Sequence, residues 1–456
     1  MAPKFGTSGL RGLVSELTPD LVADYIRAFI AACPMGNGLY LGRDLRASSP
    51  GLAQVVAEAA RGEGIAVTDC GAVPTPALAL VAMQAGAAAV MVTGSHIPAD
   101  RNGLKFYRPD GEITKRDEAA ILEHLGRNGA GKSALLQPGP DTGGAWLERA
   151  ARGWGADALS GMKVGLWSHS AVSRDLLLQG LAGLGAETVE LGRSETFVPV
   201  DTEAVPDHVC AAFRSWAAEH GLDAIVSTDG DGDRPLLADA QGRLVPGDVL
   251  GQITARALQA QHVVTTVSAN SGVAAPGRFA TVTRTKIGSP YVIAAMAEAG
   301  AAKVVGYEPN GGFLLGFTAR GPAGEIAPLA TRDSLLPLIA VLAEAKRAGS
   351  VAACVAAEPA CFTATDRLED IPAARSQAFL ETLSASPQDF LGSLGEELQA
   401  TDRMDGLRLS LHSGRVLHLR PSGNAPEFRL YTEAESPAMA GDLLRRARSR
   451  VAARLR

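Results

Sequence analysis

The sequence predicts an α/β protein with three similar domains, each with a mainly parallel mixed sheet, and a smaller C-terminal α+β domain. Short β-rich apolar runs alternate with Ala/Leu-rich stretches of helical length, which is typical of parallel strands joined by helices. This alternation recurs in three blocks, and the third strand of each block leads into a short polar or glycine-rich loop. The length of 456 residues is sufficient for three or four domains, each with its own core.

The three blocks share one arrangement and differ in the loop that ends them. Their nine strands are expected at 39–42, 65–71, 87–93, 162–168, 187–192, 222–228, 262–268, 280–285 and 301–307. The loops that follow the third strands read TGSHIP, DGDGDR and EPNGG. Because parallel α/β sheets bind ligands at the carboxyl ends of their strands, we expect these loops to face one central cleft.

Composition shifts and Gly/Pro-rich linkers place the domain boundaries. We expect domain I, with the TGSHIP loop, at residues 1–145 and domain II, with DGDGDR, at 146–246. Domain III, with EPNGG, is expected at 247–367, and the C-terminal domain IV at 368–456. In domain IV the pattern changes, because 407–423 and 427–434 resemble antiparallel strands. The last segment, MAGDLLRRARSRVAARLR, is expected to form a basic closing helix.

One uncharged stretch raises the question of a membrane span. No Asp, Glu, Lys or Arg occurs from Cys70 to Ala99, which is long enough to cross a bilayer. Pro74, Pro76 and Gly86 interrupt it, however, and it ends in the polar TGSH. A short helix over 76–84 and a buried strand over 88–93 explain it better, so no membrane partner is expected.

Charge and cysteine content narrow the class of protein further. The chain has 43 Lys+Arg and 49 Asp+Glu, a net charge of −6 that gives no reason to expect nucleic acid as a partner. Its 5 cysteines form no CxxC pair and no Cys/His metal spacing. The start, MAPKFGTSGLRG, contains no apolar signal region. We therefore expect a reduced, cytoplasmic protein.

Residues 126–133, GRNGAGKS, match the Walker A pattern, so a P-loop ATPase is one alternative. A working P-loop needs a buried strand before it and a long helix after it. Here TKRDEAAILEHL before the motif is helical in pattern, and ALLQPGP after it is stopped by Pro138 after one turn. A flexible linker over 126–144 is the expected structure.

The loop DGDGDR places Asp229, Asp231 and Asp233 at alternate positions after an apolar strand. Converging carboxylates repel one another unless a cation neutralises them, and oxygen ligands suit Mg²⁺. A calcium EF-hand loop does not fit, because Arg234 occupies its sixth position and Ala240 its twelfth. The loop therefore predicts a magnesium site, with a plain acidic turn as the alternative.

The loop TGSHIPADRNGLKFY places Ser95 at the end of an apolar strand, with His96 beside it and Lys105 ten residues later. No GxSxG surrounds Ser95, which argues against a serine hydrolase. A serine in a Gly-rich loop is more often a turn residue than a nucleophile. Next to a Mg²⁺ loop, however, such a serine can carry a phosphoryl group.

The segment RPSGNAPEFR offers guanidinium groups and clustered amides, which suit a phosphate dianion. The alternative is an ordinary hairpin with flanking arginines. The groups concerned are Arg420, Ser422, the amides around Gly423 and Asn424, and Arg429. EPNGG by itself would be interpreted as a turn.

Together these motifs resemble the α-D-phosphohexomutase family, which includes phosphomannomutases, phosphoglucomutases and phosphoglucosamine mutases. The matching segments, in the order of the family, are GTSGLRG (6–12), TGSHIPADRNGLKFY (93–107), DGDGDR (229–234), GYEPNGG (306–312) and RPSGNAPEFR (420–429). The resemblance spans nearly the whole chain. It implies four domains around a central cleft, the first three alike.

The resemblance also implies a role for each motif. Ser95 would be the phosphoserine, and Mg²⁺ would bind Asp229, Asp231, Asp233 and a phosphoserine oxygen. Lys105 would assist proton transfer, and three further groups would frame the phosphoryl group: Arg11, His96 and Arg234. Glu308 and Asn310 would hold sugar hydroxyls. The non-reacting phosphate would be bound by Arg420, Ser422, Gly423, Asn424 and Arg429.

The implied reaction interconverts hexose 1-phosphate and hexose 6-phosphate through a hexose 1,6-bisphosphate, which also serves as activator. The expected partners are hexose phosphates, and the expected assembly is a monomer or homodimer. A non-catalytic sugar-phosphate-binding protein is the alternative from another class. It is disfavoured because Ser95, Lys105 and the three aspartates occur together.

Departures from the family pattern bear on the choice of hexose. Many relatives carry TASHNP in the serine loop, where this chain has Gly94 and Ile97. In the phosphate loop, Thr and Glu are common where this chain has Asn424 and Ala425. The sugar loop is usually GExSGH; here Asn310 replaces the Ser and Gly312 the His, which counts against phosphoglucosamine mutase. Proteobacterial phosphomannomutases often resemble this chain. Mannose phosphate is therefore the expected substrate, with glucose phosphate and, less favoured, glucosamine phosphate as the alternatives.

Overall fold

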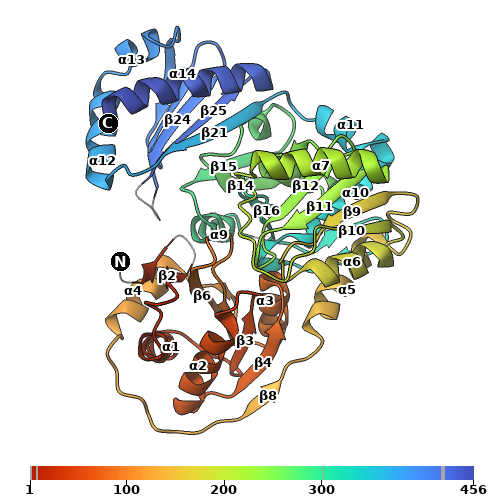
Figure 1. Ribbon diagram of the computed structural model, residues 1–456, viewed down its shortest axis with the longest axis vertical. Coiled ribbons are helices and arrows are strands. Elements are labelled where there is room, and N and C mark those ends of the chain that lie inside the picture. The colour runs from red at the N-terminus through yellow and green to blue at the C-terminus, as the bar shows by residue number, and fades with distance from the viewer. Residues whose placement is uncertain (1–2, 7–8, 301, 423–426, 456) are drawn as a thin grey trace.

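The computed structural model describes residues 3–6, 9–300, 302–422 and 427–455 (Figure 1). Within these ranges the strands form four main sheets and one two-stranded ribbon, β18 (Ala319–Arg320) with β19 (Glu325–Ile326). Three sheets are mixed and the last is antiparallel, which confirms the predicted fold class. The first and last sheets lie toward opposite ends of the molecule, and the second and third lie between them and to one side (Figure 1).

The first sheet has a parallel centre and antiparallel flanks. Its strands run in the order β1-β2-β6-β5-β3-β4-β8, with β7 beside β6. Their bounds are β1 (Lys4–Phe5), β2 (Leu10–Leu13), β3 (Leu39–Arg43), β4 (Val67–Ala72), β5 (Ala88–Val92), β6 (Arg101–Arg108), β7 (Gly111–Glu112) and β8 (Leu136–Pro138). Side chains of α1 (Pro19–Ala32), α2 (Ser49–Gly62) and α4 (Lys115–Glu123) share one core with this sheet, and α3 (Thr75–Gln84) covers the other face.

The uncharged stretch that could have been a membrane span contains β5, a buried strand of the first sheet. Val90 and Val92 pack in the core with α1 and α2, whereas Ala89 and Met91 pack against α3. All five residues of β5 are buried, as expected for a parallel strand covered by helices on both faces. Among the described residues, no helix is long and apolar enough to cross a membrane.

The second and third sheets share one large hydrophobic core. The second runs β10-β9-β11-β12-β13 and the third β15-β14-β16-β17-β20. Their strands are β9 (Lys163–Trp167), β10 (Glu187–Leu191), β11 (Ala224–Thr228), β12 (Pro235–Asp239), β13 (Leu244–Val245), β14 (His262–Thr266), β15 (Thr281–Thr285), β16 (Val304–Tyr307), β17 (Phe313–Leu315) and β20 (Leu329–Asp333). Helices α5 (Thr142–Trp154), α6 (Arg174–Gly183), α8 (Gly247–Ala257), α10 (Leu335–Ala348) and α11 (Val351–Ala356) contribute to this core. Helices α7 (Asp207–His220) and α9 (Ser289–Glu298) cover the outer faces.

The predicted repeat is present in the strand order. Each of these three sheets contains three parallel strands in the order second-first-third, followed by an antiparallel fourth: β4-β3-β5-β6, β10-β9-β11-β12 and β15-β14-β16-β17. The nine predicted strands are all present, with ends that differ by no more than about three residues, as is usual for sequence-based boundaries. The three loops of interest therefore occupy the same position in three sheets, between the third and fourth strands.

The fourth sheet is antiparallel, in the order β21-β25-β24-β23-β22. Its elements are β21 (Phe362–Leu368), α12 (Ala373–Ala385), α13 (Gln388–Gly392), β22 (Leu398–Asp402), β23 (Leu407–Leu411), β24 (Val416–Pro421), β25 (Phe428–Ala434) and α14 (Pro437–Leu455). Leu417 and Leu419 of β24 pack in the core with the helices. Because side chains alternate along a strand, His418 and Arg420 lie on the other face, which carries polar groups.

Two segments differ from the sequence-based expectation. Residues 136–138 do not continue a helical turn before Pro138; they form β8, which pairs in parallel with β4. Strand β21 joins the fourth sheet at residue 362, ahead of the expected start of domain IV at 368. Each pairing joins segments more than sixty residues apart in the chain, so local sequence does not indicate it. The proposed boundaries at 145, 246 and 367 stay predictions.

Candidate active site

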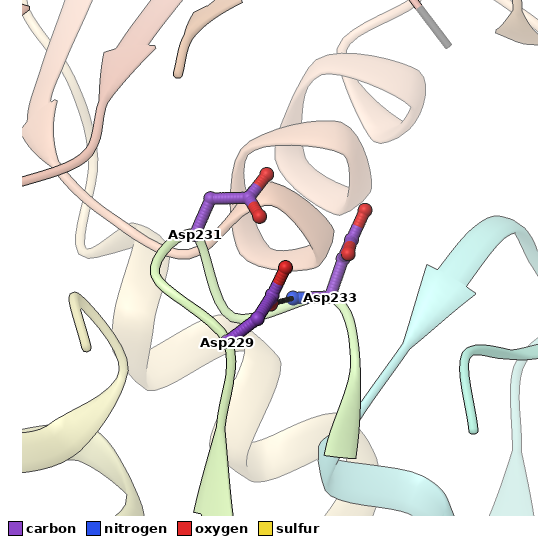
Figure 2. A group of neighbouring side chains, drawn as sticks. All are labelled: Asp229, Asp231 and Asp233. Carbon is purple, nitrogen blue, oxygen red and sulfur yellow. Dashed lines mark hydrogen bonds between the residues drawn. The ribbon is translucent and has the colours of Figure 1, made fainter. Parts of the chain in front are cut away.

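The DGDGDR loop connects β11 to β12 and brings three buried carboxylates together. The side chains of Asp229, Asp231 and Asp233 are 0% exposed, and one carboxylate oxygen of each lies within 4.8 Å of the others. Figure 2 shows them projecting from one loop toward a common space. Gly232 has φ +76°, a conformation that glycine adopts without strain and that closes this tight turn.

The cluster has free coordination capacity for a cation. The Oδ1 atoms of Asp231 and Asp233 are buried and have no hydrogen-bond partner. Burial, together with the charges of the other two aspartates, raises the pKa of Asp229 well above its usual value. Three buried oxygen donors with unsatisfied lone pairs are the arrangement expected of a magnesium site, so the residues fit this metal.

Lys105 is the nearest positive group to these carboxylates. It lies on β6, and its Nζ is 2.5 Å from Asp231 Oδ2 and 2.6 Å from Asp233 Oδ2. Thr75, the first residue of α3, donates its hydroxyl to the same Asp231 oxygen at 2.6 Å. The first sheet and its helix therefore touch the metal loop of the second sheet directly.

Ser95 lies in the loop after β5 and faces the metal loop. Its side chain is buried, and its Oγ donates to Asp229 Oδ2 at 2.6 Å. The Nδ1 atom of His96 lies 3.3 Å from the same hydroxyl. Ser95 has φ +53°, a conformation that non-glycine residues adopt rarely and mainly where surrounding contacts enforce it. The structure thus brings together the predicted nucleophile and the predicted metal ligands.

Arg46 enforces the conformation of the Ser95 loop, and sequence reasoning missed it. Its buried guanidinium donates to the carbonyl oxygens of Ser95, Ile97, Pro98 and Arg101 and pairs with Asp44 at 3.2 Å. A Cβ at Gly94 would lie 2.7 Å from its guanidinium carbon, which explains a glycine where many relatives have alanine. The charged segment GRDLRASSP at the carboxyl end of β3 could have indicated such a role.

Further positive charges surround Ser95. Arg234 Nε lies 3.9 Å from carboxylate oxygens of Asp229 and Asp233. Burial and the neighbouring charges of Arg234 and Arg332 lower the pKa of Arg11 to about 10. Burial and the charge of Arg234 also hold the pKa of His96 well below its usual value, so its imidazole is neutral. A basic environment of this kind suits a phosphoryl group.

The EPNGG loop, the expected sugar loop, connects β16 to β17. Glu308 and Asn310 are both buried, and Glu308 Oε1 accepts a hydrogen bond from Arg332 Nη1 at 3.3 Å. Asn310 Oδ1 accepts a hydrogen bond from the amide of Gly312 at 2.9 Å and so stabilises its own loop, and its expected contact with the sugar stays a prediction. Arg332, on β20, also binds Asp233 Oδ2 and was not found from the sequence. It links the sugar loop to the metal loop.

The expected phosphate loop is carried by β24 and β25. Arg420 and Arg429 are directly paired across these strands, on the face away from the helices. Arg420 Nε lies 3.3 Å from Asp405, and Arg429 pairs with Glu427. The charge of Arg429 also contributes, after burial and nearer cations, to the lowered pKa of His96. Ser422 is held by its amide, which donates to the Glu427 carbonyl, whereas Gly423 and Asn424 lie outside the described residues.

A pocket of about 200 Å³ opens between the second, third and fourth sheets. Its lining includes Thr202, Pro309 beside the sugar loop, and Tyr431 on the arginine-bearing face. Residues of the second, third and fourth sheets thus line one pocket.

Comparison with known families agrees with this geometry. The models for alpha/beta/alpha domains I, II and III of phosphoglucomutase/phosphomannomutase match residues 2–131, 146–242 and 246–362. The chain belongs to the phosphoglucomutase/phosphomannomutase family.

Individual relatives support the family assignment over nearly the full chain. A phosphomannomutase from Sinorhizobium fredii is 44% identical, over 97% of this chain and 98% of the relative. A phosphomannomutase from Salmonella muenchen is 40% identical, over 99% of this chain and 96% of the relative. The fold is that of a phosphoglucomutase/phosphomannomutase family protein from Burkholderia thailandensis, with a TM-score of 0.77 at 21% identity over 98% of this chain and 97% of the other.

The Walker-like segment takes no part in this family's site. Helix α4 precedes it and the short strand β8 follows, so the strand and helix that a P-loop needs are both missing there. Its Gly126 amide donates to the Asp24 carboxylate at 3.0 Å, and its Ala130 amide to Glu63 at 2.9 Å. Amides that bind carboxylates are not available to cradle a phosphate.

Lys132→Ala should therefore leave mutase activity within about twofold of the wild type, as expected for an exposed position remote from the cleft. Steady-state assay of the purified variant tests this. A loss of tenfold or more would mean that the segment contributes to catalysis.

Proposed function

We propose that this chain interconverts mannose 1-phosphate and mannose 6-phosphate through a phosphorylated Ser95. The observation that carries the proposal is the hydrogen bond of 2.6 Å between Ser95 Oγ and Asp229, within a buried cluster of three aspartates. Two phosphomannomutase relatives at 44% and 40% identity support mannose phosphate as the substrate. Glucose phosphate is the second substrate that the same site would accept.

In the proposed cycle, phosphorylated Ser95 transfers its phosphoryl group to a free hydroxyl of the sugar. The hydroxyl oxygen forms the new P–O bond and loses its proton, and the P–Oγ bond breaks. Mg²⁺ held by Asp229, Asp231 and Asp233 would neutralise charge on the phosphoryl oxygens. Arg11 and Arg234 add fixed positive charge beside Ser95, and the neutral His96 can donate a hydrogen bond to a phosphoryl oxygen.

Lys105 is the proposed group for proton transfer. In this structure its ammonium is paired with Asp231 and Asp233. A cation on these carboxylates would compete with that pairing and weaken it, because both draw on the same negative charge. Lys105 would then be available to the sugar hydroxyl, and after losing one proton to solvent its neutral amine could accept the hydroxyl proton.

The resulting 1,6-bisphosphate must reverse its orientation so that its other phosphate returns to Ser95. Arg420 and Arg429 are proposed to hold whichever phosphate is not reacting, since they lie together on the open face of the fourth sheet. A hexose 1,6-bisphosphate would serve as activator by phosphorylating Ser95.

We also propose a cytoplasmic location, which agrees with five cysteines that are all free thiols.

Steady-state assays on mannose 1-phosphate, glucose 1-phosphate and glucosamine 1-phosphate, each with a trace of its 1,6-bisphosphate, test the proposal. We expect the highest kcat/KM for mannose 1-phosphate and the lowest for glucosamine 1-phosphate. If none of the three sugar phosphates is converted, the mutase proposal is refuted. A preference for glucosamine 1-phosphate would refute mannose phosphate as the proposed substrate. ATP hydrolysis measured on the same preparation would favour the P-loop alternative if it persisted in Asp231→Asn.

Arg420→Ala should lower kcat/KM by roughly ten- to a hundredfold, about 1.5–3 kcal/mol for a lost charge-assisted hydrogen bond. Binding energy from the non-reacting phosphate positions the reacting hydroxyl, so kcat should fall together with affinity. The loss should be similar for mannose and glucose phosphates, because these arginines would contact phosphate and not the sugar.

Arg445→Ala is the matched control for that variant. Arg445 lies on α14, on the opposite side of the fourth sheet, with its side chain 74% exposed. Its replacement should leave kcat/KM unchanged. An Arg420→Ala effect confined to one of the two hexoses would refute the role in phosphate binding.

A further inference from the structure

Arg332 occupies a central position in the site although no motif contains it. It is 2% exposed on β20, the edge strand of the third sheet. Its Nε and Nη2 bind Asp233 Oδ2 at 3.1 and 2.7 Å, and its Nη1 binds Glu308 Oε1 at 3.3 Å. One guanidinium therefore pairs with a carboxylate of the metal loop and with the only carboxylate of the sugar loop.

The sugar loop leaves space for this side chain. A Cβ at Gly312 would lie 2.6, 2.8 and 3.0 Å from Cδ, Cγ and Cβ of Arg332. The stem of Arg332 thus packs directly on the loop backbone at Gly312, which has no side chain.

Arg332 is fixed in place from the first sheet. Its neighbour Thr331 donates to Glu112 Oε1 at 2.7 Å, and Ser289 donates to Glu112 Oε2 at 2.7 Å. Glu112 belongs to β7, so it anchors both β20 and the start of α9 to the first sheet. Glu112 thus holds the backbone next to Arg332, and two buried carboxylates hold its guanidinium. We therefore expect Arg332 to keep its position when substrate enters.

We propose that Arg332 is a specificity-determining residue that excludes 2-amino sugar phosphates. Its guanidinium pairs with Glu308 and so withholds the negative charge of this carboxylate from a substrate ammonium group. Neutral hexoses lose nothing by this pairing, because Glu308 can still accept hydrogen bonds from hydroxyls. The inference rests on the proposed function, in which Glu308 contacts the sugar.

The electrostatic environment supports the exclusion. Besides Arg332, the positive side chains of Arg11, Arg234 and Lys105 lie around Asp233. At an effective dielectric constant near 20, two positive charges about 6 Å apart repel each other strongly enough to change binding by a factor of tens to a hundred. Glucose and glucosamine phosphates differ only in the group on C2, so they are matched probes of this charge.

The test is the ratio of kcat/KM for glucosamine 1-phosphate to that for glucose 1-phosphate, at pH 6.5 to keep the amine protonated. Arg332→Met should raise this ratio at least tenfold, because Glu308 is then free to pair with the ammonium. Arg332→Lys, which keeps the charge, should leave the ratio close to the wild type. Glu308→Gln should lower it or leave it unchanged, since the attractive charge is removed while Arg332 stays.

Arg149→Met is the control for the loss of a buried arginine. Arg149 is 6% exposed and pairs with Asp333 at 2.7 Å, one residue along the chain from Arg332, but it has no contact with the sugar loop in the described structure. This variant should leave the ratio unchanged. A purely structural role of Arg332 would lower activity on both substrates equally, and an unchanged ratio in Arg332→Met would therefore overturn the proposal.

Binding without turnover separates this inference from the proposed function. In the Ser95→Ala protein, calorimetric titration with glucosamine 6-phosphate and glucose 6-phosphate should show the same shift in relative affinity on adding Arg332→Met. If that variant fails to fold, Arg332→Gln, which retains hydrogen-bond donors without the charge, takes its place. An unaltered affinity ratio would refute the charge argument even if the wild type proves to be an active mutase.

Discussion

Ser95→Ala should abolish mutase activity, with a loss in kcat on the order of 10⁴-fold or more, as is typical when a covalent nucleophile is removed. Its Oγ lies 2.6 Å from Asp229 and beside His96, on which the charges of Arg234, Arg11 and Lys105 act, and it is the hydroxyl that we propose is phosphorylated. Intact-mass spectrometry of freshly purified protein should show a fraction heavier by one phosphate. That species should be absent from Ser95→Ala.

Ser170→Ala provides the comparison for this variant. Ser170 is also buried in a loop at the carboxyl end of a parallel strand, but its Oγ bonds to the backbone of Val198. Its replacement should retain activity within a few fold and should still yield the phosphorylated species. Phosphate mapped to another residue, or normal turnover by Ser95→Ala, would show that the nucleophile has been assigned incorrectly.

Removal of Mg²⁺ should have the second-largest effect. Excess EDTA should abolish turnover and added Mg²⁺ should restore it, because three buried carboxylates and a phosphoserine repel one another without a cation. Asp231→Asn should lower kcat by about a hundredfold or more, since it replaces a charged ligand by a neutral one. Its thermal stability should fall little, because the substitution also removes repulsion between buried charges.

Asp239→Asn distinguishes loss of the metal from loss of a buried carboxylate. Asp239 ends β12, the strand that follows the metal loop, and its carboxylate binds Arg243 and nearby amides instead of joining the cluster. This variant should lose stability while its dependence on Mg²⁺ concentration stays the same. Unchanged activity of the wild type in excess EDTA would refute the metal site.

The local parts of the fold and site could be predicted from the sequence. The βα alternation indicated the three similar sheets, and contiguous motifs contained Ser95, Lys105 and the three aspartates, which the structure brings within hydrogen-bond distance of one another. The strands were predicted correctly because each depends on residues adjacent in the chain, whereas the roles of the site residues stay predictions. In the EPNGG motif, the hydrogen bond of Asn310 to its own loop could not be predicted, because backbone geometry decides it.

The supporting residues could not be predicted in this way. Arg46 contacts the Ser95 carbonyl across 49 residues of sequence, and Arg332 reaches Asp233 across 99. An arginine at the end of a strand has many local interpretations, most of them simple exposure to solvent. Only the packing of the sheets shows that both guanidinium groups are buried on the loops that carry the chemistry.

The sequence by itself determined the strands, the order of the loops and the chemical groups on them, because strand periodicity and turn residues are local properties of the chain. The tertiary structure alone decided which groups meet. Lys105 lies between two aspartates, and the side chain of Asn310 accepts a hydrogen bond from its own loop. Arg332 packs over Gly312, so that its guanidinium links the metal loop to the expected sugar loop. These contacts depend on how separate sheets pack, which no short segment of sequence encodes.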